Sequence, residues 1–126
     1  MATKTYYLNE TKKGDIICWD VCSQCGNFAE VKLFDDNTDY FVYTKNFTDH
    51  RFRLLGQNYS YFTGDKLSLT ITIPNSAEIR QSISTSCITD DFGNVVGYVY
   101  SFCIEDSTDN DYNDIYVNVC AWRKNG

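Results

Sequence analysis

The sequence predicts an all-β protein, an antiparallel β-sandwich of about nine short strands in a single domain, residues 1–126. Three observations lead to this prediction. Apolar and polar residues alternate with a period of two, no window has the period of an amphipathic helix, and Asn, Asp, Gly and Ser turns separate the apolar runs. No linker, repeat or low-complexity segment divides the chain.

The clearest strands lie in the second half of the chain. Residues 66–74 place apolar side chains on one face and Ser or Thr on the other, and this run ends at Pro74. Residues 95–104 and 115–122 are rich in β-branched and aromatic residues. Weaker runs of the same kind predict six further strands at residues 5–8, 15–21, 29–34, 40–45, 52–55 and 81–89.

Charge and hydropathy exclude some classes of partner. The net charge is −6, with no basic footprint for nucleic acid. No apolar run is long enough to insert into a membrane. The first fifteen residues lack the features of a secretory signal, so we expect cytoplasmic synthesis, or release by a non-classical route.

Six cysteines could form disulfides in an oxidising compartment. Without a signal peptide we expect free thiols, most of them buried as small apolar residues. Cys22 and Cys25 form a CxxC motif, and Cys18 lies four residues before it. A zinc site needs a fourth ligand, which the spacing does not indicate, and His50 is the only histidine.

The most unusual segment is EDSTDNDYND, residues 105–114. It holds five carboxylates and two carboxamides without a cation, and it lies between two apolar strands. Oxygen donors at this density suit a hard cation such as calcium, and five carboxylates nearly balance two calcium ions. An EF-hand is excluded, because Asp114 stands where that loop needs glycine and Cys120 where it needs glutamate. The alternative is a solvated acidic turn.

This segment resembles the signature loop of the calcium-mediated bacterial lectins that bind fucose and mannose, the LecB-like family. GDKLSLTITIPNSAEIR, residues 64–80, looks like the strand pair that precedes the loop in that family, and residues 16–34 are similar more loosely. The resemblance covers residues 64–126 best, and it supports calcium more firmly than sugar.

The resemblance implies a lectin with two calcium ions and a sugar that completes their coordination. It implies metal ligation by Glu105, Asp109, Asp111, Asn113, Asp114 and the C-terminal Gly126, which in the family reaches a partner protomer's ion. It implies sugar contacts from Asp106, Ser107, Thr108, Asp111 and Asp114, and from the specificity loop through Ser23, Gln24 and Gly26. Vicinal hydroxyls can replace calcium-bound waters because the calcium shell is flexible.

The chain departs from the family in three places. An asparagine ligand expected near Ser23 is missing, the specificity loop is SQCG, and the final strand is two residues longer after Asp114. Two further alternatives therefore stay open: a calcium-independent fucoside-binding lectin on the same sandwich, and a calcium-stabilised structural or adhesive domain without a sugar site.

An enzyme is the remaining rival, through a Cys–His pair with His50 or through paired carboxylates. The basic neighbours of His50 indicate an exposed turn, and carboxylates bound to calcium cannot donate protons, so we expect no catalysis. Because a single weak sugar site gains avidity only when several are linked, we expect a homodimer or a higher homo-oligomer.

Overall fold

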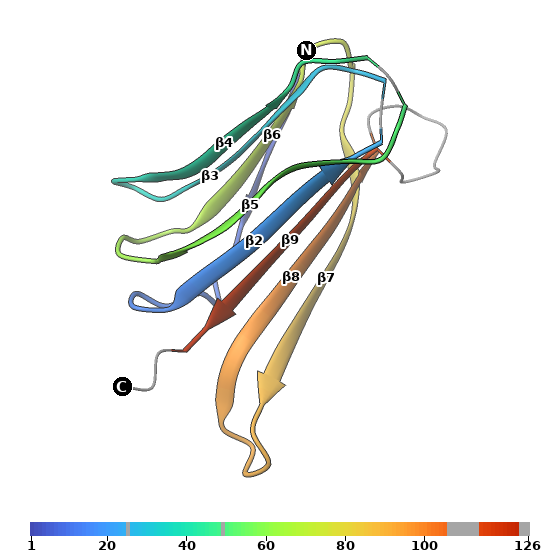
Figure 1. The fold of residues 1–126 in the computed structure, drawn as a ribbon. Helices are drawn as coiled ribbons and strands as arrows, with labels where there is room; N and C mark the ends of the chain where they lie inside the picture. Colours follow the sequence, from blue (N-terminus) through green and yellow to red (C-terminus); the bar gives the residue numbers. More distant parts are fainter. Residues whose placement is uncertain (25, 49, 106–113, 124–126) are drawn as a thin grey trace.

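The computed structural model describes residues 1–24, 26–48, 50–105 and 114–123. Within these ranges the chain forms nine strands and no helix (Figure 1). The strands are β1 (Ala2–Tyr7), β2 (Ile16–Ser23), β3 (Ala29–Phe34), β4 (Asp39–Lys45), β5 (Arg53–Tyr61), β6 (Ser68–Ile73), β7 (Arg80–Thr89), β8 (Val95–Glu105) and β9 (Ile115–Trp122). Each predicted strand is present, and the all-β prediction is confirmed. In the part of the chain that is described, no helix is long and apolar enough to cross a membrane.

The strands form two antiparallel sheets, as predicted for a sandwich. The four-stranded sheet has the order β1-β6-β3-β4 and the five-stranded sheet the order β5-β2-β9-β8-β7. Figure 1 shows the two sheets as layers, with the β7–β8 hairpin extending beyond the rest of the sandwich.

Alternation along the strands builds the core between the sheets. In β6, Leu69, Ile71 and Ile73 are fully buried, and Thr70 and Thr72 between them are half-buried. In β9 the core-facing residues are Ile115, Val117, Val119 and Ala121, all fully buried. The apolar residues of the period-two pattern in these strands are therefore the residues that form the core.

The edge strand β5 is longer than the sequence predicts. Only its first residues, within 52–55, carry an apolar signal, yet the strand pairs with β2 as far as Tyr61. Its continuation from Gly56 is polar and aromatic and is mostly exposed. Strand propensity misses such a segment because an edge strand is held by backbone pairing more than by burial.

A register shift in β5 lies where the strand meets the core. Val21 pairs with Gly56 and Cys22 with Leu54, so Leu55 is an extra residue. A Cβ atom at Gly56 would lie 2.2 Å from Cζ of Tyr43, so only glycine allows this ring to pack there. The Tyr43 hydroxyl in turn accepts a hydrogen bond of 2.9 Å from Nε1 of Trp19.

Two expectations from the sequence are wrong. Residues 64–80 contain β6 and the connection to β7 rather than a strand pair, and the pair that precedes the acidic segment is β7–β8. The cysteines that the structure describes are not buried: Cys87 is exposed and the others, Cys18, Cys22, Cys103 and Cys120, are half-buried. These four lie on strands that are half-exposed because only one face of the five-stranded sheet covers the core.

Candidate functional site

The candidate site lies at one end of the sandwich, which we call the acidic end. Here β2, β4 and β8 finish and β5 and β9 begin (Figure 1). The strand register brings their terminal residues together, since Ser23 at the end of β2 pairs with Arg53 on one side and with Ile115 on the other. Residues that are far apart in the sequence thus meet next to Asp114, the last residue of the acidic segment.

The structure describes five of the predicted site residues: Glu105, Asp114, Ser23, Gln24 and Gly26. All five belong to the acidic end. The remaining predicted residues lie outside the described ranges, namely Asp106, Ser107, Thr108, Asp109, Asp111, Asn113 and Gly126.

Glu105 and Asp114 bound the acidic segment, and both are buried. Glu105 is 0% exposed and Asp114 is 8% exposed. The β8–β9 ladder ends at the pair of Ile104 with Ile115, and the backbone N–H of Asp114 still donates to the carbonyl of Ile104 at 3.3 Å. Both residues have interaction partners, as is usual where a charged group is buried. The segment therefore begins and ends on carboxylates that are fixed in the protein.

Ser23 and Gln24 join the end of β2 to the start of β9. The backbone N–H of Gln24 donates to the carbonyl of Asp114 at 2.8 Å, and the Tyr116 hydroxyl donates to Oε1 of Gln24 at 3.2 Å. Ser23 is fully buried. Among the described residues, its Oγ is the one buried side-chain oxygen or nitrogen without a hydrogen-bond partner. An orphaned hydroxyl costs about 1–3 kcal/mol, so an additional ligand at this position would relieve a real penalty.

Gly26 lies where the β2–β3 connection approaches the β4–β5 connection. A Cβ atom at this position would lie 2.6 Å from Cε1 of His50. Glycine is thus required for the close approach of the two connections. His50, the candidate catalytic base from the sequence, is an exposed ring packed against the backbone at Gly26.

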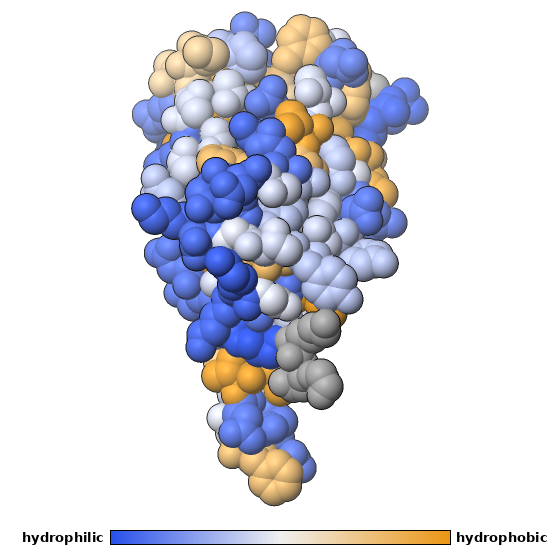
Figure 2. All heavy atoms as spheres, turned by 90° about the vertical axis from the view of Figure 1, so that its left-hand side faces the viewer, coloured by the Kyte–Doolittle hydropathy of each residue, from blue (hydrophilic) through white to orange (hydrophobic). Residues whose placement is uncertain are grey.

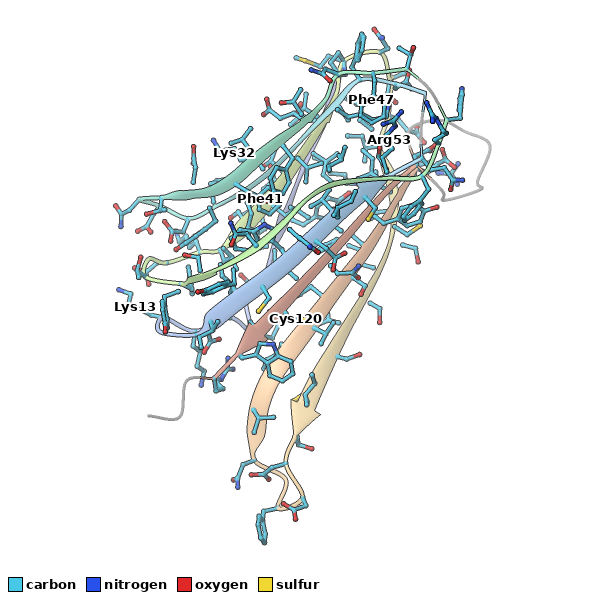
Figure 3. All side chains as sticks on the ribbon, in the orientation of Figure 1. Lys13, Lys32, Phe41, Phe47, Arg53 and Cys120 are labelled. Carbon is cyan, nitrogen blue, oxygen red and sulfur yellow. The ribbon has the colours of Figure 1, made fainter. Side chains whose placement is uncertain are left out.

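Two cations at the acidic end were not singled out from the sequence. Lys45 is fully buried, donates from Nζ to the carbonyl of Phe47, and lies 4.3 Å from the centre of the Phe47 ring. The guanidinium of Arg53 lies 4.7 Å from the same ring (Figure 3). Lysine is rarely buried fully, and no motif near residue 45 marks it, so only its burial in the folded chain identifies it.

The described donors suit a hard cation better than a soft one. Glu105, Asp114 and Ser23 offer carboxylate and hydroxyl oxygens, which are ligands that calcium accepts. Within the described ranges no group of three or more His, Cys, Asp or Glu side chains is arranged to hold a metal ion. A calcium site at this end therefore depends on the carboxylates at 106–113, which lie outside those ranges.

Comparison with solved structures gives similarity over nearly the whole chain. The C-terminal domain of the BC2L-C lectin from Burkholderia cenocepacia superposes with a TM-score of 0.70 at 15% identity, covering 98% of each chain. The Chromobacterium violaceum lectin CV2L, in complex with alpha-methyl-fucoside, gives 0.64 at 18% identity and 96% coverage of each chain. The Ralstonia solanacearum high-affinity mannose-binding lectin gives 0.63 at 16% identity, also with 96% coverage of each chain.

These similarities show a shared fold. No protein-family model matches the sequence, and no curated protein is similar to it at a significant level. The resemblance inferred from the acidic segment thus agrees with the fold of known lectins.

Proposed function

We propose that the protein is a lectin that binds fucose-containing or mannose-like glycans. The observation that carries this proposal is the whole-chain similarity to sandwiches named as lectins, one in complex with a fucoside and one named for mannose binding. The acidic segment supports it as well, because Glu105 and Asp114, the two residues that bound the segment, are buried at one end of the sandwich.

Calcium is the cation that best fits the composition of the acidic segment. Its ligands in this proposal are Glu105, Asp109, Asp111, Asn113 and Asp114, whose oxygens are numerous enough for two ions. Bound calcium supplies a coordination site that sugar hydroxyls can share. Ser23 pairs with Ile115, the residue after Asp114, and its orphaned hydroxyl lies close in the sequence to the position where the resemblance leads us to expect an asparagine ligand. The shorter serine side chain favours a water-mediated contact there.

The sugar in this proposal contacts Asp106, Ser107, Thr108, Asp111 and Asp114, and the specificity loop through Ser23, Gln24 and Gly26. Gly126 requires a second copy of the chain to contribute. Arg123 follows β9 at the opposite end of the sandwich, and the three residues after it reach at most about 10 Å when extended, against about 26 Å for the eight residues of β9. A ligand role for Gly126 therefore implies the homodimer.

Retention on fucose-agarose and mannose-agarose, first with calcium and then with excess EDTA, tests the proposal. We expect retention that EDTA abolishes and that Asp111→Asn removes. Asp91→Asn is the matched control, because Asp91 is an exposed carboxylate of the β7–β8 hairpin. Retention that survives EDTA would indicate a calcium-independent lectin, and no retention in either condition would favour a structural calcium domain.

A second assay separates binding from catalysis. We propose a binding protein without turnover, so chromogenic fucosides and mannosides should release no product above the buffer rate. Release that Asp111→Asn abolishes and Asp91→Asn preserves would instead identify a glycosidase.

A further inference from the structure

Four cysteines share the outer face of the five-stranded sheet. Along β2, Ile17, Trp19 and Val21 point into the core, so Cys18 and Cys22 point outward. Along β9, the core-facing Val119 and Ala121 place Cys120 outward (Figure 3), and in β8 Cys103 lies between the buried Phe102 and Ile104. All four thiols are half-buried, hence within reach of small reagents.

The strand register separates these thiols into one close pair and two distant ones. Cys18 lies directly opposite Cys120 on the neighbouring strand. Residues directly opposite on antiparallel strands have Cα atoms about 4.5 or 5.5 Å apart, and both values fall in the range of disulfides. Cys22 and Cys103 both lie opposite Tyr116, on either side of β9. They are thus two strand spacings apart, about 9.5 Å, which is too far for a disulfide.

We propose that Cys18 and Cys120 are a disulfide-forming pair that joins β2 to β9 when the protein meets an oxidising environment. This site is independent of the sugar site. In the reaction one thiolate attacks a small-molecule disulfide, releasing one thiol and leaving a mixed disulfide. The second thiolate then attacks the protein sulfur and releases the other thiol. The two cysteines lose two electrons and two protons, and the small disulfide is reduced to two thiols.

The bond would cross-link the centre of the five-stranded sheet. It closes a loop of about 100 residues, and in the chain-entropy model long loops give the largest stabilisation. The two strands also lead to the acidic end, since β2 ends at Ser23 and β9 begins after Asp114. Oxidation would therefore stabilise the sheet that carries the site without altering a site residue.

Peptide mapping of the oxidised protein tests the proposal. The reaction uses glutathione disulfide at pH 8, because burial and the nearby Cys18 and Asp20 charges raise the pKa of the Cys120 thiol and reduce its thiolate fraction. Trypsin then yields two cysteine-containing peptides, 14–32 and 81–123. We expect these peptides to be joined under non-reducing conditions, and the oxidised protein to melt several degrees above the reduced protein.

Single variants assign the bond to its two cysteines. C18S and C120S should each abolish the joined peptide and the increase in Tm. C22S and C103S are matched controls on the same face and should preserve both. A joined peptide that persists in C18S, or a bond found between two chains, would overturn the proposal. So would a wild-type protein with the native circular dichroism spectrum that forms no joined peptide.

Discussion

The two ends of the sandwich bury polar groups in different ways. At the opposite end, formed by the connections 7–16, 34–39, 61–68 and 89–95, each buried carboxylate is surrounded by donors from the protein. Asp15 accepts from Nη1 of Arg123 at 2.5 Å and from the backbone N–H of Lys12 at 2.8 Å. Figure 2 looks onto this end, where hydrophilic residues predominate.

Asp35 at the opposite end is enclosed in the same manner. Its carboxylate accepts from the Tyr40 hydroxyl and from the backbone N–H groups of Asn37 and Thr38, both at 2.8 Å. A Cβ atom at Gly64 would lie 2.3 Å from its Oδ2, so a glycine is needed there for the chain to close around the carboxylate. The protein alone satisfies this group.

The acidic end leaves a buried oxygen unsatisfied by the described residues. Ser23 Oγ is such an atom, and it adjoins the segment with five carboxylates and no cation of its own. The comparison teaches that the buried carboxylates of the opposite end are satisfied by the protein alone, whereas the acidic end holds a buried hydroxyl that we propose a bound ion or ligand would satisfy.

The largest expected loss of stability comes from a substitution at the opposite end. Arg123→Ala leaves the buried Asp15 without its charged partner and should lower the free energy of unfolding by about 3 kcal/mol. Urea denaturation measures this loss. Lys13→Ala is the control, because Lys13 pairs with Asp65 at 3.9 Å where both side chains are more than half exposed, and it should cost less than about 1 kcal/mol. Equal losses from both variants would contradict the distinction.

Calcium should stabilise the acidic end and leave the opposite end unchanged. At a calcium concentration of about 100 times Kd, the gain in unfolding free energy is about 2.7 kcal/mol. Thermal unfolding with calcium and with EDTA measures it. Asp111→Asn should remove the gain, whereas Arg123→Ala should lower both curves equally. A wild-type Tm that is independent of calcium would contradict calcium binding and leave the calcium-independent lectin.

Each end has a buried serine whose hydroxyl can be removed by substitution, so the effects on stability can be compared directly. Ser68 at the opposite end is 4% exposed and donates to the carbonyl of Lys66 at 2.8 Å, so Ser68→Ala should cost about 1 kcal/mol. Ser23→Ala in EDTA should stabilise the protein by about 1 kcal/mol or more, because it removes an orphaned buried oxygen. Urea titration measures both variants, and a loss from Ser23→Ala in EDTA as large as that from Ser68→Ala would show that Ser23 is already satisfied.

Much of the fold could be predicted because core-facing residues can be recognised in the sequence by the alternation of apolar and polar side chains. Leu69, Ile71 and Ile73 alternate with threonines, and this pattern survives folding as one buried and one half-buried face. The far part of β5 could not be predicted, since Gly56 and the polar residues after it are held by pairing with β2 rather than by burial.

The candidate site is a prediction from composition, and the sequence does not reveal the residues that surround it. The carboxylates of 105–114 are contiguous, so their density alone indicates a cation site. Lys45, by contrast, comes from β4, and no local pattern sets it apart from an exposed lysine. The cross-strand neighbours Cys18 and Cys120 were equally hidden, because their contact depends on the register of β2 with β9.

The smallest expected effect is confined to acid pH and concerns Asp35. Burial raises the pKa of this carboxyl, but the hydrogen bonds from Tyr40, Asn37, Thr38 and Gly64 together outweigh burial and hold the pKa below its ordinary value. A folded-state pKa below that of the unfolded chain, about 3.9, contributes stability that is fully present above the unfolded value. That stability is lost as the pH falls through the folded value.

Asp35→Asn should therefore flatten the fall in unfolding free energy as the pH drops below about 5. Urea titration at a series of pH values measures this change. Because the effect comes from a single carboxyl, it should be small. Asp90→Asn is the control. Backbone hydrogen bonds from Asn94 and Phe92 lower the pKa of Asp90 as well, but Asp90 is only half-buried at the β7–β8 turn, where solvent screens its interactions more than those of the buried Asp35. A pH profile that Asp90→Asn flattens as much as Asp35→Asn would mean that enclosure at the opposite end adds nothing to these hydrogen bonds.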